Sequence, residues 1–313
     1  MKIVPIFFAF DERMLMPAGV CITSLLVNAD KDTFYDIFVL HNKDCDFSTS
    51  LLTRLPDVYK NCRISFRTIN EEFAGAYEIR GITISTYYKL LAPIAIPEYD
   101  KILYSDVDVI FREDLSKYYE IEIGDNYFAA VDNCSVLRPE VQKSLESRLN
   151  IDWRDGYYYA GNLIVNSRQL KQDNKVEEFL RLAHFNFYQQ DMDIMNIACN
   201  KRIYPLGPSF CITVPLYDLI IDRYEDMREI YGEEELEHAL KSGIVHYNGA
   251  KPWNSICYNM DIWWYYYRQS VFFEEGFVHR FWDDHRQLLD NLSLSKRLKL
   301  VLNYFRKRFP FRR

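Results

Sequence analysis

The sequence predicts an α/β fold: a mixed, mostly parallel sheet covered by helices over residues 1–255, and a helical appendage over residues 256–313. Two observations predict it. Strand-like and helix-like segments alternate through the first half of the chain, which is typical of parallel strands joined by helices. From residue 256 onward the sequence is aromatic and helical, without another strand-like run. A length of 313 residues and a hydrophobic content of 49% are ample for a buried core.

Strands are expected at continuous apolar runs, and helices where apolar residues recur with helical spacing. The first half is predicted to run strand, helix, strand, helix, strand over Lys2–Phe10, Pro17–Asn28, Tyr35–His41, Phe47–Leu55 and Arg63–Ile69. Next come a helix, an apolar strand run and two further strands at Ser85–Leu91, Tyr99–Phe111, Tyr127–Val131 and Asn162–Asn166. The second half is predicted to hold three helices and one short strand at Ser167–Ala183, Gln189–Cys199, Arg223–Lys241 and Gly243–Tyr247.

The charge of the main body excludes nucleic acid as a partner. The formal net charge is −7, although residues 292–313 contain eight Lys or Arg and no acid. By subtraction, residues 1–291 carry a net charge of −15. Nucleic-acid binding requires a basic face for phosphate contacts, so we expect no nucleic acid.

Hydropathy and cysteine usage indicate a cytoplasmic protein. No stretch reaches the about 18 apolar residues that a membrane-spanning helix needs, and Asp11 interrupts the apolar start too early for a signal peptide. The seven cysteines form no C-x-x-C pair, which argues against a disulfide framework and a structural zinc site. We therefore expect reduced, mostly buried cysteines.

An aspartate pair at the end of an apolar run is the first candidate site. The chain contains four Asp-x-Asp pairs, which begin at Asp30, Asp44, Asp106 and Asp191. Only Asp106 and Asp108 end a continuous apolar run, where a buried strand reaches the edge at which open α/β sheets bind ligands. Two carboxylates held this close repel each other unless a cation lies between them. The pair therefore indicates a divalent metal.

A second candidate follows the short strand at residues 243–247. His246, Gly249 and Lys251 lie within six positions of one another. Imidazole can join carboxylates around a transition metal, glycine lets backbone approach a ligand, and lysine supplies a cation for phosphate. A single histidine is more often structural than a ligand, but the aspartate pair reverses that preference.

Five segments of the chain resemble family 8 of the retaining glycosyltransferases. This family has the GT-A (Rossmann-like) fold and includes bacterial lipopolysaccharide glucosyl- and galactosyltransferases and glycogenin. The matching segments are Phe7–Asp11 with Ser24–Leu26, Ser85–Leu90, Tyr104–Asp108, Tyr159–Asn166 and His246–Trp253. Their order and spacing match the family pattern across about residues 1–255. The resemblance implies a GT-A catalytic domain.

The resemblance also implies site residues. Three residues are expected to bind manganese or magnesium, which would bridge the diphosphate of a UDP-sugar: Asp106, Asp108 and His246. The nucleoside is expected to meet Ala9, Phe10 and Asp11. Other donor contacts are expected from Lys89, Ser105, Val107, Gly249 and Lys251. Asp11, at the end of a strand, is expected to accept a hydrogen bond from the uracil, and the N-cap of a helix is an equally good alternative.

The resemblance places three residues near the sugars: Asp132, Asp191 and Met192. Asp132 resembles an acidic residue near the donor and acceptor hydroxyls, and the alternative is a turn aspartate. Asp191 resembles the aspartate that contacts the donor sugar. Met192 stands where the family has a glutamine beneath the anomeric carbon, and a thioether cannot replace an amide. This favours attack by the acceptor hydroxyl beside the leaving phosphate; a shifted alignment, which would give the sugar contact to Asp191 or Asp193, is the alternative.

Further departures also lie near the donor. Lys89 stands where the family often has arginine, which keeps the charge but loses the bidentate fork. Tyr159 replaces a common asparagine, Met14 stands where an aromatic residue often stacks on uracil, and the spacing from Gly249 to Lys251 is one residue shorter than usual. These positions surround the sugar rather than the metal, so the identity of the donor sugar stays open.

The basic C-terminal stretch is predicted to form an amphipathic helix. Its apolar residues recur with helical spacing at Leu294, Leu298, Val301, Leu302, Phe305 and Phe309. Its basic residues lie mostly off that face: Lys296, Arg297, Lys299, Arg306, Lys307 and Arg308. Such a helix binds an anionic membrane surface. The alternative is a helix docked on the catalytic domain with a solvated basic face.

Together these features predict a metal-dependent retaining hexosyltransferase at the inner face of the membrane. The expected reaction moves glucose or galactose from a UDP-sugar to a hydroxyl of a surface glycan or glycolipid such as lipopolysaccharide. A sugar nucleotidyltransferase would instead need a glycine-rich, basic phosphate loop near the N-terminus, and residues 8–13 do not form one. A non-catalytic nucleotide-sugar-binding module is the other alternative, because of Met192 and Tyr159.

Overall fold

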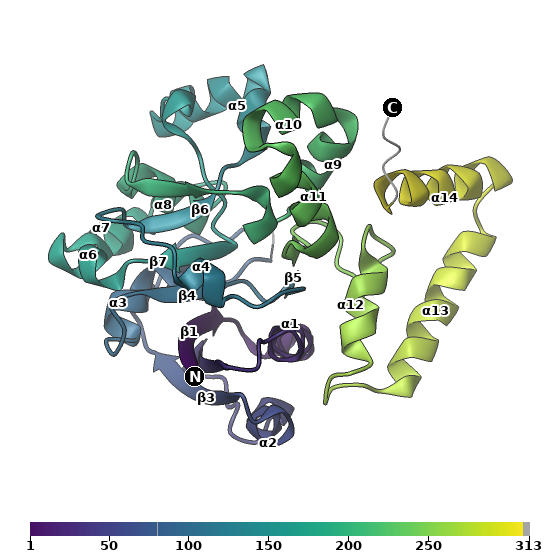
Figure 1. The fold of residues 1–313 in the computed structure, drawn as a ribbon, viewed down its shortest axis with the longest axis horizontal. Coiled ribbons are helices and arrows are strands. Elements are labelled where there is room, and N and C mark those ends of the chain that lie inside the picture. The colour runs from purple at the N-terminus through teal and green to yellow at the C-terminus, as the bar shows by residue number, and fades with distance from the viewer. Residues whose placement is uncertain (80, 309–313) are drawn as a thin grey trace.

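A computed structural model describes residues 1–79 and 81–308. A seven-stranded sheet lies at the centre, with strands in the order β3-β2-β1-β4-β7-β6-β8 (Figure 1). These strands are β1 (Lys2–Ala9), β2 (Thr33–Asn42), β3 (Cys62–Ile69), β4 (Ile102–Ser105), β6 (Phe128–Val131), β7 (Asn162–Val165) and β8 (Ile203–Leu206). Only β7 runs antiparallel to its neighbours β4 and β6, so the predicted mixed, mostly parallel sheet is confirmed.

Helices cover the two faces of this sheet. They are α1 (Leu15–Val27), α2 (Leu55–Tyr59), α3 (Ala92–Ala95), α4 (Ser116–Tyr119), α5 (Pro139–Ser144), α6 (Ser167–Gln172), α7 (Lys175–Leu182), α8 (Asp191–Ala198), α9 (Val214–Asp222), α10 (Tyr224–Tyr231) and α11 (Glu233–Ser242). Successive residues of β1 enter opposite clusters: Ile6 and Phe8 pack on the side of α1, whereas Phe7 packs with Leu90 and Phe179. This alternation follows from the two-residue period of a strand.

Several predicted boundaries were wrong, for local reasons. The helix predicted at Phe47–Leu55 lies later, as a 3₁₀ turn at Leu51–Arg54 followed by α2. Pro56 lies in the first turn of α2, where a helix tolerates proline. The helix predicted at Ser85–Leu91 is a 3₁₀ helix, η3 (Ile84–Leu91). Strand β8 and helices α5 and α9 were not predicted.

Two predicted long helices are each interrupted once. The run at residues 167–183 breaks at Asn174, whose φ is 51°, and the run at 223–241 breaks at Gly232, whose φ is 83°. Glycine and asparagine are the residues that most readily adopt this left-handed conformation, which ends a helix.

The C-terminal segment forms three helices beside the body, α12 (Met260–Tyr267), α13 (Glu275–Asp290) and α14 (Leu294–Arg308) (Figure 1). Helix α12 is anchored on the body, because Trp263 and Trp264 belong to the same buried cluster as α1. Close packing continues at Gly19, where an added Cβ would lie 2.1 Å from the ring of Phe272. The domain boundary expected near residue 255 stays a prediction.

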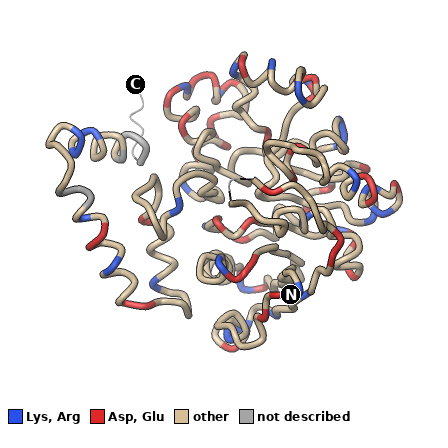
Figure 2. The backbone as a smooth tube through the Cα atoms, turned by 180° about the vertical axis from the view of Figure 1, so that it is seen from behind, with Lys and Arg blue, Asp and Glu red and all other residues tan. Residues whose placement is uncertain are grey.

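Helix α14 has an exposed apolar face and no acidic residue. Leu294, Leu298 and Leu302 are 74%, 52% and 64% exposed, and Val301 and Phe305 are also exposed. Figure 2 shows basic and no acidic positions along α14, in contrast to the acidic stretches of the body. Phe309, the last residue of the predicted apolar face, lies outside the described residues. No helix in the described part of the chain is both long and apolar enough to span a membrane.

Candidate active site

The predicted aspartate pair lies in the turn between two strands. Asp106 directly follows β4, and Asp108 directly precedes the short strand β5 (Val109–Ile110). Between them Val107 is buried in the apolar cluster on the side of α1, so the two carboxylates lie on the opposite side of the turn. The backbone N–H of Asp106 donates to the carbonyl of Gly161 at 2.7 Å, which fixes the turn against the loop before β7.

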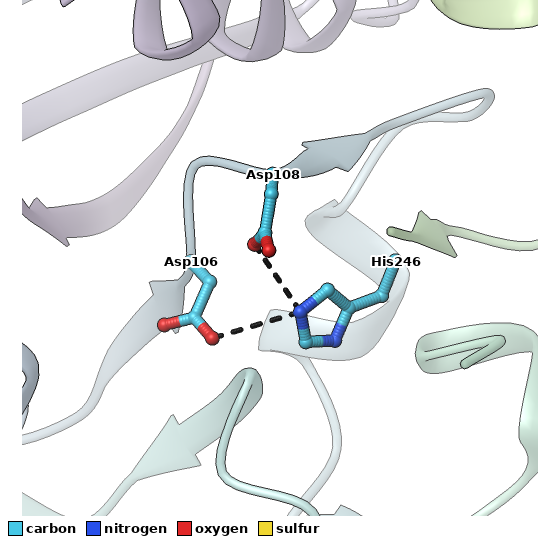
Figure 3. A group of neighbouring side chains, drawn as sticks. All are labelled: Asp106, Asp108 and His246. Atoms are coloured by element: carbon cyan, nitrogen blue, oxygen red, sulfur yellow. Dashed lines mark ion pairs between the residues drawn. The ribbon is translucent and has the colours of Figure 1, made fainter. Parts of the chain in front are cut away.

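His246 reaches the aspartates through a second, two-stranded sheet. Strand β9 (Val245–His246) pairs antiparallel with β5, and the register sets His246 opposite Val109. The Nε2 atom of His246 lies 3.2 Å from Oδ1 of Asp108 and 3.7 Å from Oδ2 of Asp106 (Figure 3). The sequence separation of these residues is large, and this short ladder brings them together.

The three side chains fit a divalent cation. One ligand atom from each of Asp106, Asp108 and His246 lies within 4.8 Å of the others. Two carboxylates and an imidazole suit manganese, and carboxylates also suit magnesium. Among the described residues no other group of three His, Cys, Asp or Glu side chains meets this closely.

The environment of His246 directs Nε2 toward the carboxylates. Its other nitrogen, Nδ1, lies 3.6 Å from Sγ of buried Cys211. Gly161 leaves room for the ring, since a Cβ there would lie 2.3 Å from Cε1 of His246. Burial alone would lower the pKa of His246, but the Asp108 carboxylate and Cys211 raise it to about 10. The ring is therefore protonated at neutral pH when no metal binds.

Lys251 completes this side of the site. Its ammonium donates to Oδ2 of Asp108 and to the carbonyl of Tyr247. Burial would raise the pKa of Asp108, but Lys251 and His246 outweigh it and hold that pKa well below its ordinary value. Asp108 is therefore charged, as a metal ligand must be.

The buried ammonium of Lys89, a residue of η3, lies between the carboxylates of Asp106 and Asp191. Its Nζ lies 3.1 Å from Oδ1 of Asp106 and 2.7 Å from Oδ2 of Asp191, which is the first residue of α8. Burial would lower the pKa of Lys89, but these two carboxylates raise it, so the ammonium stays charged. Asp106 therefore lies between two cationic groups, Lys89 and His246.

These side chains line a cavity of about 680 Å³. It is lined by most of the predicted site residues: Ala9, Phe10, Asp11, Lys89, Asp106, Val107, Asp108, Asp191, Met192, His246 and Lys251. Three predicted residues do not line it: Ser105, Asp132 and Gly249. Ser105 is buried and donates to the carbonyl of Asp106 at 2.8 Å, so it supports the turn from behind.

Asp11 and Asp132 are both occupied by local contacts. Asp11 caps the 3₁₀ helix η1 (Glu12–Met14) by accepting from the N–H of Arg13 at 3.0 Å, and it pairs with the Arg13 guanidinium at 2.7 Å. The capping geometry is therefore confirmed, and the uracil contact stays a prediction. Asp132 is half-buried and accepts from the N–H of Tyr157 at 3.5 Å, and burial raises its pKa. Its contact with sugar hydroxyls also stays a prediction.

Several polar residues of the cavity were not predicted as site residues. They are Arg13, Thr83, Thr86, Asn133, Ser135, Gln189, Gln190 and Asn248. Thr86 lies in a segment that carried the resemblance, and its Oγ1 donates to Oδ1 of Asp191 at 2.8 Å. Gln190 immediately precedes Asp191 and is buried, with φ at 46°. Sequence patterns offer no signal for Asn133 and Ser135, which follow the end of β6.

The fold is that of the GT-A class of proteins. A solved structure of the galactosyltransferase LgtC in complex with donor and acceptor sugar analogues shares this fold, with a TM-score of 0.71 and 24% identity over 88% of this chain and 99% of that one. Residues 5–257 match the family model described as Glycosyl transferase family 8. The chain therefore belongs to glycosyl transferase family 8 and is a glycosyltransferase.

Two curated relatives are similar over most of their length. Lipopolysaccharide 1,2-glucosyltransferase of Escherichia coli is 24% identical over 257 residues, which cover 79% of this chain and 72% of that protein. General stress protein A of Bacillus subtilis is 22% identical over 270 residues, which cover 81% of this chain and 88% of that protein.

Proposed function

We propose that this chain is a metal-dependent, retaining hexosyltransferase that moves glucose or galactose from a UDP-sugar to a hydroxyl of a surface glycan such as lipopolysaccharide. This proposal rests on one observation. Ligand atoms of Asp106, Asp108 and His246 lie within 4.8 Å of one another, and all three residues line the cavity. Similarity to the lipopolysaccharide glucosyltransferase supports the acceptor class.

The metal side of the cavity would hold the diphosphate. When bound, a divalent ion supplies a Lewis acid that neutralises the charge developing on the leaving oxygen. Asp106, Asp108 and His246 would hold it. Lys251 already lies against Asp108 and needs only a change of its flexible side chain to reach a phosphate oxygen. Gly249 does not line the cavity itself, but a glycine there would let the neighbouring backbone approach a phosphate closely.

The part of the cavity around Asp191 and Met192, the sugar side, would hold the donor sugar. Asp191 would accept hydrogen bonds from its hydroxyls. Met192 lines the same cavity, and its thioether offers no nucleophile for a covalent sugar intermediate. We therefore expect the acceptor hydroxyl to attack on the face from which the diphosphate leaves, with a phosphate oxygen taking its proton, so that the configuration is retained.

A thermal-shift panel tests the donor and the metal together. The protein is melted with UDP-, GDP- and TDP-sugars, each with and without Mn²⁺. We expect stabilisation by a UDP-hexose that requires Mn²⁺, together with slow metal-dependent hydrolysis of that donor. Absence of stabilisation by any UDP-sugar would count against the proposed donor. Stabilisation without hydrolysis or transfer would favour the non-catalytic binding module.

Helix α14 would place the enzyme on the inner face of the cell membrane. Its exposed apolar face and its acid-free sequence fit an anionic lipid surface. A triple variant, Lys296→Gln, Arg297→Gln and Lys299→Gln, should pellet with anionic liposomes less than the wild type does. A matched variant of the body, Lys31→Gln, Lys43→Gln and Lys60→Gln, should not differ from the wild type. Equal pelleting of the α14 variant would refute this role.

A further inference from the structure

Lys89 is enclosed by three hydrogen-bond acceptors. Its side chain is only 2% exposed. The ammonium lies 3.1 Å from Oδ1 of Asp106, 2.7 Å from Oδ2 of Asp191 and 3.0 Å from the carbonyl of Ala160. A lysine ammonium carries three protons. Within the described part of the chain these three oxygens account for all of them, so none is left for a phosphate.

Each carboxylate that Lys89 contacts has one further hydrogen bond of its own. Tyr104 donates its hydroxyl to Oδ1 of Asp106 at 2.5 Å, and Thr86 donates to Oδ1 of Asp191 at 2.8 Å. The Oδ2 atom of Asp106 faces His246. Lys89 therefore connects a carboxylate of the metal side to a carboxylate of the sugar side, and its own side chain is almost fully buried.

We propose that Lys89 is a positioning residue that fixes Asp191 relative to Asp106, so that the donor sugar is held at a set distance from the metal side without any contact between Lys89 and the diphosphate. This inference rests on the proposed function, because it takes Asp191 to contact the sugar of a UDP-hexose.

Lysine suits this position better than arginine does. The ammonium is compact, and its three protons point toward three separate oxygens contributed by the β4–β5 turn, the loop before β7 and the start of α8. A guanidinium is planar and carries five donors in a fixed fork. In a place that is 2% exposed it would leave donors without partners or would push Asp191 away. The residue therefore matches a bridging role rather than a phosphate clamp.

The two roles of Lys89 differ in which ligand depends on it. A phosphate contact would stabilise UDP and UDP-hexose equally. A positioning residue would affect the hexose-bearing ligand through Asp191 and would leave UDP itself almost unchanged, because Tyr104 still holds Asp106. Affinities for both ligands therefore separate the two roles, whereas a rate alone does not.

The test measures dissociation constants for UDP, UDP-glucose and UDP-galactose in Mn²⁺ by calorimetry. The variants are Asp191→Asn, Thr86→Val, and the double variant Lys89→Met with Asp191→Asn. The double variant avoids leaving the buried carboxylate of Asp191 without its cation, and its melting temperature and circular dichroism report whether it folds. The wild type provides the reference.

Asp191→Asn and Thr86→Val should weaken the preferred UDP-hexose about tenfold and UDP by no more than about twofold. Adding Lys89→Met to Asp191→Asn should change either affinity by no more than about twofold, since the effect of Lys89 passes through Asp191. A further tenfold loss of UDP affinity in the double variant would overturn the proposal and assign Lys89 to the diphosphate. If the wild type bound UDP but no UDP-hexose, or neither, the proposed function itself would fail.

Discussion

The two sides of the cavity are built differently: the backbone holds the metal side, and side chains hold the sugar side. Asp106 donates its N–H to the carbonyl of Gly161, and Asp108 accepts through its carbonyl from the N–H of Tyr247 at 2.9 Å. His246 lies in the β5–β9 ladder. Asp191, in contrast, is oriented by the side chains of Lys89 and Thr86. The position of Asp191 therefore depends on the identity of two neighbouring side chains, whereas backbone pairing brings the metal-side residues together.

The largest effect should come from Asp108→Asn on the metal side. The variant loses a carboxylate ligand and the partner of His246 and Lys251. Metal-dependent donor hydrolysis should fall by about 100-fold or more, since even outer partners of metal ligands are worth about 10–100-fold. The control Asp44→Asn alters an exposed aspartate of another Asp-x-Asp pair and should leave the rate unchanged. Equal rates in the two variants would contradict the metal assignment.

Gly161→Ala should disturb the metal side without replacing any of the three proposed metal ligands. The new Cβ would lie 2.3 Å from Cε1 and 2.6 Å from Nδ1 of His246, so the imidazole must move. Mn²⁺ affinity should fall about 10–100-fold, as for other changes that reorient a metal ligand. A Mn²⁺ titration followed by calorimetry measures it. Gly276→Ala on α13, where the nearest atom is the flexible end of Arg280 at 3.3 Å, is the control and should bind Mn²⁺ as the wild type does.

Metal affinity should rise with pH. Burial opposes protonation of His246, but Asp108 and Cys211 raise its pKa to about 10, so the metal-free ring carries a proton below that pH. Binding requires the neutral ring and therefore releases the proton. Mn²⁺ affinity should increase by up to about tenfold per pH unit between about pH 6 and pH 8. A pH-independent affinity in the wild type would contradict the release of a proton from His246 on metal binding.

Met192 on the sugar side should give the smallest effect. Met192→Leu keeps an apolar side chain of similar volume, and we expect hydrolysis and transfer rates within about threefold of the wild type. Met192→Gln restores the family's amide and should change the ratio of rates with UDP-glucose and UDP-galactose. A large loss of activity in Met192→Leu would show that the thioether itself takes part, and would remove the contrast between the two sides.

The metal side could be predicted from sequence because its residues end apolar runs. Asp106 directly follows β4, Asp108 directly precedes β5, and His246 lies in the short strand β9. The family resemblance supplied most of the sugar side, including Asp191 and Met192. Asn133 and Ser135 could not be predicted, since their place at the cavity depends on how the chain folds back after β6.

The contacts of Lys89 likewise depend on tertiary structure. The sequence shows a cation in a matching segment, but only the fold reveals that Asp106, Asp191 and the carbonyl of Ala160 surround its ammonium. For the fold, element order was largely predictable, whereas the breaks at Asn174 and Gly232 were missed because helical patterning continues across them. Both residues carried the local signal for a left-handed turn.

The β5–β9 ladder has a consequence for how the protein matures. Both aspartates are synthesised long before His246, and a nascent chain that has passed Ile110 holds two carboxylates but no imidazole. Contacts between residues so distant in sequence form late, because closing a long loop costs entropy before any contact offsets it. A cation site that includes His246 would therefore be complete only after the β5–β9 ladder has formed.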